Sequence, residues 1–286
     1  MNKITKYIDK FTQLVMFKHS IFSLPFIFIA MLIASNGWFG WKLFILGTFS
    51  ALSARNFAMG VNRYLDRDVD ALNPRTKNRP SVDGRVSNIE MISFIIINAF
   101  IFIGVAYIIN DLAFKLSIPI LIILGAYTLF KRFSVLAHII LGISLGLAPI
   151  AGVVAVLNDF TMWSIYLAIG VTFWVAGFDL LYSLQDIEFD KKHKLHSIPS
   201  KFGVKNTMMI AKIFHTLTII FWAIFIIKAS LGIFAMIAVI FSAIMLGYEH
   251  YLVNKDFTKI DKAFFTVNGY LGFIFLILII LEVTIN

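Results

Sequence analysis

The sequence predicts an all-α, polytopic membrane protein in which nine transmembrane helices form a single domain over residues 1 to 286. Hydrophobic residues make up 59% of the chain and charged residues only 14%, a balance outside the range of soluble domains. Apolar runs recur along the chain, each about long enough to cross roughly 30 Å of hydrocarbon. These runs cover residues 20 to 36, 41 to 61, 89 to 110, 116 to 133, 135 to 157, 162 to 183, 206 to 228, 230 to 252 and 263 to 284.

The lysines and arginines test this arrangement, because the cytosolic loops of membrane proteins hold an excess of them. The loops on one side of the predicted bundle carry nearly all of the 25 basic residues. The opposite side holds only Lys42, Lys115 and Lys228, while Arg55 and Lys212 lie inside predicted helices. The bias predicts a protein of a bacterial-type inner membrane whose N-terminus faces the cytoplasm.

The net charge and the cysteine content exclude several function classes. These loop cations account for the net charge of +9, so we expect no nucleic-acid partner. The chain contains no cysteine, which excludes disulfides, thiol catalysis and cysteine-based zinc sites.

Two connections, residues 71 to 88 and 184 to 205, are longer than the others. Loops of this length inside a compact bundle are usually functional or disordered. The first is rich in turn-forming and basic residues. Both belong to the predicted cytosolic side, and we expect them to cap a site at that end of the bundle.

Two acidic stretches, 120 positions apart, each end an apolar run. At 3.6 residues per turn, a spacing of four places the two aspartates of each stretch on one helix face. By the same calculation Asp68 and Glu188 point to the opposite side of their helices. The residues that share a face are Asn62, Asp66 and Asp70 in the first stretch and Asp186 and Asp190 in the second.

Paired carboxylates at a membrane helix end would repel one another without a cation between them. Oxygen ligands without histidine or cysteine favour a hard cation, and Mg²⁺ usually takes one or two protein carboxylates together with water and phosphate. We therefore predict that the two stretches face each other and bind Mg²⁺ and a diphosphate. The alternative is that these aspartates only cap helix ends and pair with neighbouring arginines.

Other polar residues have more than one interpretation. Arg55 lies inside a predicted helix, where it binds an acceptor carboxylate or a phosphate, or pairs with an aspartate of the bundle. Lys131 and Arg132 end a predicted helix and are either phosphate ligands or orientation signals. His193 and His196 have the spacing of a zinc pair, but solvated loop residues are the better interpretation. No pattern assigns a role to the remaining histidines, His19, His138, His215 and His250.

The motifs themselves resemble a known family. Asn62, Asp66 and Asp70 are followed by Asn-Pro-Arg-Thr at 73 to 76 and by Arg79-Pro80. The second stretch reads Asp-x-x-Tyr-Ser-x-x-Asp-x-x-x-Asp over 179 to 190 and is followed by Ser-Ile-Pro at 197 to 199. Together with the segments 127 to 134 and 145 to 152, these motifs are similar to those of the UbiA superfamily of membrane prenyltransferases.

This resemblance implies nine helices around a central cavity that opens laterally to lipid. It also implies that asparagine and aspartates coordinate Mg²⁺ on an isoprenoid diphosphate, which ionises to an allylic cation that alkylates an aromatic ring. The chain looks most like a 4-hydroxybenzoate polyprenyltransferase of ubiquinone biosynthesis. The alternative is the similar enzyme that prenylates a menaquinone precursor of the futalosine route.

The expected roles follow from the resemblance and from the residue types. We expect catalysis and metal binding from Asn62, Asp66, Asp70, Asp186 and Asp190, diphosphate binding from Arg79, Lys131, Arg132 and Tyr182, and acceptor binding from Arg55 and Asp179. One departure concerns the loop after the last aspartate. Where many relatives have a glycine and, two residues on, a lysine, this chain has Lys194 and His196.

Two other classes of membrane protein are alternatives. Phosphotransferases that use CDP-alcohols also carry paired aspartates in a membrane helix, but their motif needs a glycine where this chain has Asn62, and it leaves the second acidic stretch unexplained. A cation transporter would use intramembrane carboxylates, which should then lie near the bilayer midplane. Here the acidic residues gather at one predicted end.

Overall fold

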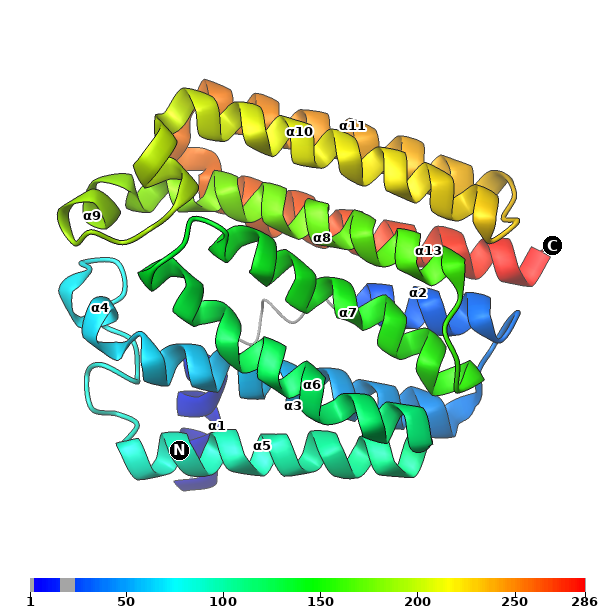
Figure 1. Cartoon of the computed structure of the whole chain (residues 1–286), viewed down its shortest axis with the longest axis horizontal. Helices are drawn as coiled ribbons and strands as arrows, with labels where there is room; N and C mark the ends of the chain where they lie inside the picture. Colours follow the sequence, from blue (N-terminus) through cyan, green and yellow to red (C-terminus); the bar gives the residue numbers. More distant parts are fainter. Residues whose placement is uncertain (1–2, 16–23, 286) are drawn as a thin grey trace.

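The computed structural model describes residues 3–15 and 24–285, and within these ranges the chain is helical and contains no strand. The long helices lie side by side as a bundle, with short helices at one end (Figure 1). The helices are α1 (Lys3–Leu14), α2 (Leu24–Ala34), α3 (Gly40–Leu65), α4 (Arg67–Leu72), α5 (Asn88–Ile109), α6 (Asp111–Ala126), α7 (Ala137–Leu157), α8 (Met162–Ser183), α9 (Ile187–Lys192), α10 (Ile198–Lys228), α11 (Ile233–Lys255), α12 (Ile260–Lys262) and α13 (Asn268–Ile285). Short 3₁₀ turns are η2 (Tyr127–Arg132), η3 (Leu184–Asp186) and η4 (Phe257–Lys259), and η5 (Ala263–Val267) is a π-helical turn.

Seven helical segments in the described part of the chain are long and apolar enough to cross a membrane. The predicted spans 20 to 36 and 41 to 61 correspond to α2 and α3. The first four residues of the span 20 to 36 lie outside the described residues, and the described part of α2 has 11 residues. Helix α3 has 26 residues but carries Arg55 and other polar groups, and it is not among the seven. The all-helical class is confirmed, while the number nine stays a prediction.

Two helices begin earlier than the apolar runs predicted. Helix α10 begins at Ile198 rather than 206, because the Ser197 side chain caps its first turn and Pro199 occupies a position where a proline is tolerated. Gly203, with φ of 75°, then kinks this helix. Helix α6 begins at Asp111 rather than 116, because the Asn110 side chain accepts a hydrogen bond from Ala113 N. Capping residues, not hydrophobicity, set these two starts.

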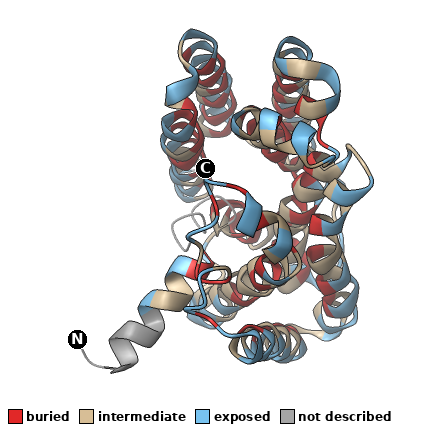
Figure 2. Ribbon diagram, turned by 90° about the vertical axis from the view of Figure 1, so that its left-hand side faces the viewer, coloured by how far each residue is buried: buried red, intermediate tan, exposed pale blue. Residues whose placement is uncertain are grey.

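The outer faces of the helices are apolar. On α5, for example, Ile97 and Phe100 are 56% and 71% exposed. Figure 2, which looks onto the end with the short helices, shows buried residues concentrated where helices face one another. Large exposed apolar surface is the pattern of a bundle solvated by lipid.

Aromatic residues from four helices form the centre of the larger core. Phe26, Trp174, Trp222 and Phe275 are fully buried. The rings of Phe26 and Trp222 stack with centroids 5.4 Å apart, and Trp174 meets Phe178 edge to face at 5.2 Å. This packing fixes α8 between α2, α10 and α13.

A buried polar network joins α8, α10, α11 and α13 beside this core. Trp174 Nε1 donates to Asn268 Oδ1 over 2.7 Å, and Asn268 Nδ2 donates to Glu249 Oε1 over 2.7 Å. The rings of His215 and His250 meet at 3.0 Å between Nδ1 and Nε2. Hydrogen bonds of this kind hold membrane helices together where lipid supplies no partner.

Helices α7 and α8 approach each other closely at two glycines. A Cβ atom at Gly142 would lie 2.3 Å from the carbonyl oxygen of Thr172, and one at Gly146 would lie 2.3 Å from Thr172 Oγ1. Small residues four apart allow such close packing of membrane helices. His138 lies one turn before Gly142 on the same face of α7, so this contact brings its side chain against α8.

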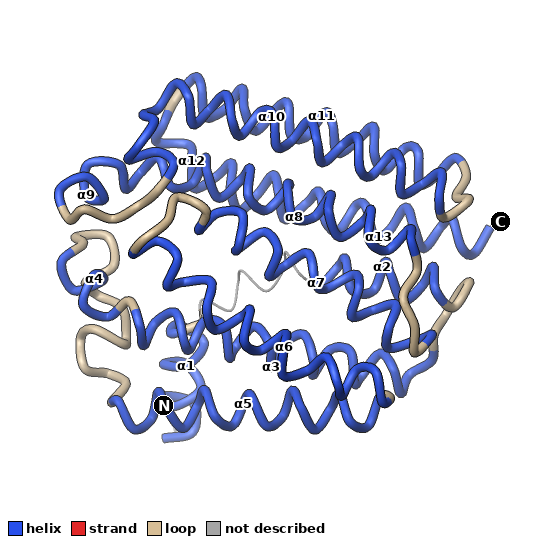
Figure 3. The backbone as a smooth tube through the Cα atoms, viewed as in Figure 1, coloured by secondary structure: helices blue, strands red, loops and turns tan. Residues whose placement is uncertain are grey.

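Both acidic stretches lie at one end of the bundle. The short helices α4 and α9, which carry parts of the two stretches, lie beside each other at the left in Figures 1 and 3. The predicted loop 71 to 88 is a series of turns that runs from the end of α4 to α5. The predicted loop 184 to 205 is mostly helical, because it contains η3, α9 and the start of α10. Residues far apart in the sequence therefore meet at this end.

Candidate active site

A cavity of about 320 Å³ opens at the end that carries the acidic stretches. Residues from α3, α4, η2, α7, α8 and α9 and from the connections between them line it. Of the predicted site residues, the cavity is lined by Arg55, Asn62, Asp66, Asp70, Arg79, Lys131, Asp179, Tyr182, Asp186 and Asp190. Arg132 is not among the lining residues.

The predicted spacing assumed that the first acidic stretch is one continuous helix. The structure instead has a break at Asp66. Helix α3 ends at Leu65 and α4 begins at Arg67, with Asp66 between them. The backbone bonds from Asp66 N to Asn62 O (2.9 Å) and from Asp70 N to Asp66 O (2.7 Å) preserve the helical spacing. Asp66 and Asp70 are therefore both buried, at 2% and 4% exposure, whereas the Asp68 side chain is 64% exposed.

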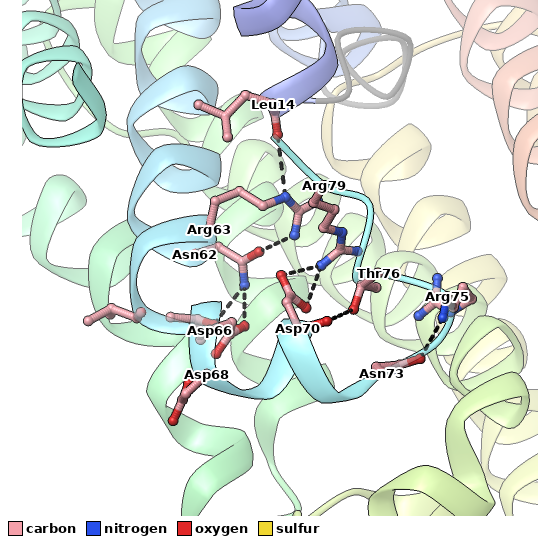
Figure 4. A network of polar contacts seen from close by, with 12 residues as sticks. Leu14, Asn62, Arg63, Asp66, Asp68, Asp70, Asn73, Arg75, Thr76 and Arg79 are labelled. Carbon is pink, nitrogen blue, oxygen red and sulfur yellow. Dashed lines mark hydrogen bonds and ion pairs between the residues drawn. The ribbon is translucent and has the colours of Figure 1, made fainter. Parts of the chain in front are cut away.

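Asp66 receives several partners on one carboxylate oxygen, and Figure 4 shows the contact with Asn62. Its Oδ2 accepts hydrogen bonds from Asn62 Nδ2 at 2.9 Å and Thr128 Oγ1 at 2.8 Å, and lies 2.5 Å from Lys131 Nζ. Its Oδ1 is buried, lies 3.9 Å from Arg132 Nη2, and has no hydrogen-bond partner among the described residues. A buried carboxylate oxygen without a partner is costly unless something binds it.

Asp70 is held by a cation from the loop that follows it. Arg79 Nη1 lies 2.7 Å and 2.6 Å from its two carboxylate oxygens. The Thr76 hydroxyl donates to the backbone carbonyl of Asp70 over 3.0 Å, which folds the loop back onto the helix end. Figure 4 shows both contacts, together with Arg63, whose Nη1 donates to Asn62 Oδ1 over 2.7 Å.

The second acidic stretch also departs from a continuous helix. Helix α8 ends at Ser183, a 3₁₀ turn contains Asp186, and α9 carries Asp190. Asp190 accepts a hydrogen bond from the Ser197 hydroxyl over 2.7 Å. The Glu188 side chain is 93% exposed and lies outside the cavity, as predicted.

Arg75, from the loop that follows the first stretch, contacts the second stretch. Its guanidinium forms an ion pair with Asp186 and donates to the Tyr182 hydroxyl over 3.1 Å. Burial alone would lower the pKa of Arg75, but the hydrogen bonds and charge of Asp186 outweigh it, so that the pKa of Arg75 is raised. Arg75 is therefore a permanent cation at the cavity mouth.

The inner wall of the cavity is apolar except for a few groups. Leu141, Leu145, Val175 and Phe178 line it. A second, mostly apolar cavity of about 100 Å³ shares Arg55 and Leu145 with the first. The site thus changes from charged at its mouth to apolar in its depth, the arrangement needed by a ligand with a charged head and an apolar chain.

Arg55 and Asp179, the predicted acceptor ligands, both line the cavity. Asp179 Oδ2 lies 2.7 Å from Nδ1 of His138, a residue to which the sequence assigned no role. The Tyr127 phenol is close enough to Arg55 and Asp179 to interact electrostatically with both. These side chains come from α3, η2, α7 and α8.

Arg132 does not line the cavity, and its role in diphosphate binding stays a prediction. Its Nη2 atom lies 3.9 Å from Asp66 Oδ1, and its guanidinium bonds to the backbone of Leu65. It also forms a hydrogen bond with Asp68 over 2.7 Å. This hydrogen bond is the largest cause of a lowered pKa of Asp68. Residues 127 to 132 form a 3₁₀ turn, in which successive side chains point about 120° apart, so Lys131 lines the cavity whereas the neighbouring Arg132 does not.

The loop after Asp190 explains part of the departure from the family pattern. Lys194 has φ of 54°, in the left-handed region that glycine adopts more readily. His196 lines the cavity, and its backbone N–H donates to the carbonyl of Lys131 over 2.8 Å. No three histidine, aspartate or glutamate side chains in the described ranges are arranged to hold a metal by themselves, which leaves the zinc interpretation of His193 and His196 without support.

The sequence analysis missed several residues of this site. Arg75 lies within the quoted Asn-Pro-Arg-Thr segment and could have been paired with the second stretch. Thr128 lies four residues from Arg132 in a motif already quoted, and a lone histidine in a membrane helix, His138, is itself a signal. Asn73 and Ser197, which bond Asp186 and Asp190, offered no signal beyond their position in turns.

The donor set fits Mg²⁺ together with a diphosphate. The Oδ1 of Asp66, which accepts no hydrogen bond from the described residues, and the carboxylates of the second stretch are hard oxygen donors. The four aspartates are already hydrogen-bonded or paired with cations, so a metal would need further ligands from phosphate and water. This arrangement matches the coordination that Mg²⁺ adopts at phosphate sites.

Comparison with known proteins gives a family and a fold. The model of the UbiA prenyltransferase family matches residues 23–278. A protein described as a 4-hydroxybenzoate octaprenyltransferase, from Janthinobacterium sp. (strain Marseille), is 27% identical over 247 residues, 85% of each chain. Another of the same description, from Herminiimonas arsenicoxydans, is 30% identical over 174 residues, which span 61% of each protein.

Solved structures agree with these matches. The apo structure of a UbiA homolog from Aeropyrum pernix K1 superposes with a TM-score of 0.84 at 29% identity, covering 92% of this chain and 98% of that one. A UbiA homolog from Archaeoglobus fulgidus, bound to DMAPP and Mg²⁺, superposes with a TM-score of 0.78 at 22% identity and covers 97% of this chain and all of that one. The family match covers most of the chain and the fold agrees over its length, so the chain belongs to the UbiA prenyltransferase family.

Proposed function

We propose that this protein transfers a polyprenyl group from polyprenyl diphosphate to an aromatic acceptor of quinone biosynthesis, with 4-hydroxybenzoate as the acceptor. The observation that carries the proposal is the single cavity in which two acidic stretches and several cations meet above an apolar wall. The description of the relatives from Janthinobacterium and Herminiimonas as 4-hydroxybenzoate octaprenyltransferases supports the choice of acceptor.

The mouth of the cavity binds the diphosphate in this proposal. Asn62, Asp66, Asp70, Asp186 and Asp190 hold Mg²⁺, which when bound neutralises the diphosphate and stabilises its departure. The protein's cations act on the same group: Arg75, Arg79 and Lys131 lie at the carboxylates and bind phosphate oxygens, and the Tyr182 hydroxyl donates beside Arg75. Charge that develops on the leaving group is met by donors already in place.

The depth of the cavity binds the prenyl chain and the acceptor. Its apolar wall and the adjoining smaller cavity suit an isoprenoid chain, and they exclude the water that would otherwise capture an allylic cation. Arg55, which lines both cavities, binds the acceptor carboxylate. We further propose that segments 71 to 88 and 184 to 205 cap the site, that nine spans cross the inner membrane, and that the site faces the cytoplasm.

The test supplies purified protein with Mg²⁺, a polyprenyl diphosphate and either 4-hydroxybenzoate or a naphthoate-type acceptor, and identifies products by mass. We expect prenylated 4-hydroxybenzoate and no product after chelation of Mg²⁺. Product only from the naphthoate-type acceptor would move the protein to the menaquinone route. Ion flux in vesicles without prenyl transfer on either acceptor would refute the proposal in favour of a transporter.

A further inference from the structure

His138 and Asp179 form a buried pair on the inner wall of the cavity. The two groups lie 2.7 Å apart, between Nδ1 of the imidazole and Oδ2 of the carboxylate. His138 is 6% exposed, whereas the Asp179 side chain is 23% exposed and lines the cavity. Both side chains line the cavity, and the carboxylate is the more exposed of the two.

The packing of α7 on α8 sets this geometry. Gly142 and Gly146 bring α7 into contact with Thr172, which lies about two turns before Asp179 on α8. The Nε2 atom of His138 is buried and has no hydrogen-bond partner among the described residues. Its one polar contact in the described structure is therefore the carboxylate of Asp179.

Asp179 differs from the carboxylates at the cavity mouth. Asp66, Asp70 and Asp186 each form an ion pair with a lysine or an arginine, and Asp190 bonds to a hydroxyl at the outer end. Asp179 instead lies beside Val175 and Phe178 on the apolar wall, within electrostatic range of Tyr127. A carboxylate here is placed to meet the acceptor ring and not the diphosphate.

The proposed reaction requires such a group. When the C–O bond of the prenyl diphosphate breaks, its electron pair leaves with the diphosphate. A ring carbon of the acceptor then forms a C–C bond with the allylic cation. That carbon must lose its proton to restore the aromatic ring, and a base must receive the proton in a site from which water is excluded.

We propose that Asp179 accepts the ring proton and that His138 is the positioning residue that holds its carboxylate toward the acceptor. In this proposal His138 carries its proton on Nδ1 and donates it to Oδ2 of Asp179, so that Oδ1 remains to accept the ring proton. Asp179 becomes a neutral acid as the ring regains aromaticity, and it returns the proton to water when the product leaves. This inference rests on the proposed function and names the base within it.

The test compares Asp179→Asn, His138→Leu and His138→Gln with the wild type. Each protein receives Mg²⁺, a polyprenyl diphosphate and 4-hydroxybenzoate with either hydrogen or deuterium on the ring. His193→Gln is the matched control, because His193 lies near the site but does not line the cavity. Thermal stabilisation by Mg²⁺ with inorganic diphosphate reports whether each variant is folded and binds at the cavity mouth.

We expect Asp179→Asn to lower kcat about 10²-fold or more, the usual loss of a general base, and to produce a deuterium isotope effect that the wild type lacks. His138→Leu should lower kcat by a similar order, since misplacing a catalytic group costs about 10²-fold. His138→Gln should recover part of this loss, because its amide also donates to the carboxylate. The KM for the diphosphate substrate and the thermal stabilisation should match the wild type in all three.

Three outcomes overturn the inference. They are wild-type kcat in Asp179→Asn, a loss of kcat without an isotope effect, and an equal loss in the leucine and glutamine variants of His138. Should His138→Leu fail to fold, the glutamine and Asp179→Asn variants still decide the question. Absence of prenylated product from the wild type with every acceptor would instead overturn the proposed function itself.

Discussion

Arg75 and Asp186, 111 positions apart in the sequence, form an ion pair across the mouth of the cavity. The same guanidinium also bonds the Tyr182 hydroxyl, and its carbon lies 5.3 Å from the centre of the Tyr182 ring. The loop that follows the first acidic stretch is therefore tied to the second stretch through a cation, and Asn73 of the same loop donates to Asp186 over 3.2 Å.

Replacing Arg75 should weaken binding of the diphosphate substrate. We expect Arg75→Ala to raise its KM about tenfold or more, in line with the loss of a charge-assisted hydrogen bond of roughly 1.5–3 kcal/mol. Arg75→Lys should recover only part, because lysine cannot bind in a bidentate manner. Arg85→Ala is the control, since Arg85 pairs with Asp83 away from the cavity. Equal KM values in all variants would contradict a diphosphate-binding role.

Asp66 and Asp68 offer a matched pair of carboxylates. Asp66 is buried and one of its carboxylate oxygens accepts no hydrogen bond from the described residues, whereas Asp68 is exposed and forms a hydrogen bond with Arg132. We expect Asp66→Asn to lower kcat/KM by at least about 10²-fold and to raise the Mg²⁺ concentration for half-maximal activity. Asp68→Asn should change either quantity less than about twofold, since exposed ion pairs contribute little. A similar loss in both variants would show that the effect is general and not local to the metal site.

Glycines on α7 should be indispensable for its contact with α8. In Gly142→Ala the new Cβ would lie 2.3 Å from the backbone carbonyl of Thr172, so the helices must move apart. We expect a lower midpoint temperature of unfolding in detergent and a loss of transfer activity, because the helix shift also displaces His138. Gly104→Ala on α5 is the control, since a Cβ there contacts nothing within 4 Å. An unchanged midpoint for Gly142→Ala would refute this packing.

Lys194 should be replaceable by glycine with a gain in stability. Its left-handed backbone costs a residue with a side chain roughly 1–2 kcal/mol. We expect Lys194→Gly to raise the unfolding midpoint in detergent or leave it unchanged, despite the greater flexibility of glycine in the unfolded chain. Lys192→Gly, in helix α9, should lower it, because glycine is a poor helix former. The opposite order of the two midpoints would be inconsistent with the backbone described here.

Asn268 should stabilise the bundle through two buried hydrogen bonds. Asn268→Leu removes the acceptor of Trp174 Nε1 and the donor to Glu249. An orphaned buried polar group costs roughly 1–3 kcal/mol, so we expect a lower unfolding midpoint. Asn206→Leu, at an exposed position of α10, should leave it unchanged. Equal midpoints for the two variants would argue against the network.

The sequence predicted which aspartates share a helix face, because this depends only on spacing within a short segment. A spacing of four residues places Asp66 and Asp70 on the same side of the chain. They remain on the same side despite the break between α3 and α4, because backbone hydrogen bonds continue across the break. Spacing gave no orientation for Lys131 and Arg132, because residues 127 to 132 form a 3₁₀ turn, in which consecutive side chains point about 120° apart. The spacing of residues in the sequence does not show where a 3₁₀ turn replaces an α-helix.

Contacts between segments that are far apart in the chain could not be predicted from the sequence. Arg75 reaches Asp186 only because its loop turns back over the cavity, and His138 reaches Asp179 only because two glycines bring α7 against α8. The starts of α6 and α10 were missed because capping side chains extended these helices past their apolar runs. The fold class, by contrast, follows from the high hydrophobic content of the whole chain, and the exact ends of single helices do not affect it.

The balance of charge in the cavity has a consequence for the order in which ligands enter. The described lining residues include five aspartates and five lysines or arginines, so the pocket is formally electroneutral when its histidines are uncharged. A divalent ion alone, or a strongly anionic headgroup alone, would disturb that neutrality at a Coulombic cost. Mg²⁺ that is already chelated by the diphosphate enters with most of its charge cancelled. The pocket without ligands therefore accommodates the Mg²⁺–diphosphate complex better than it accommodates either component alone.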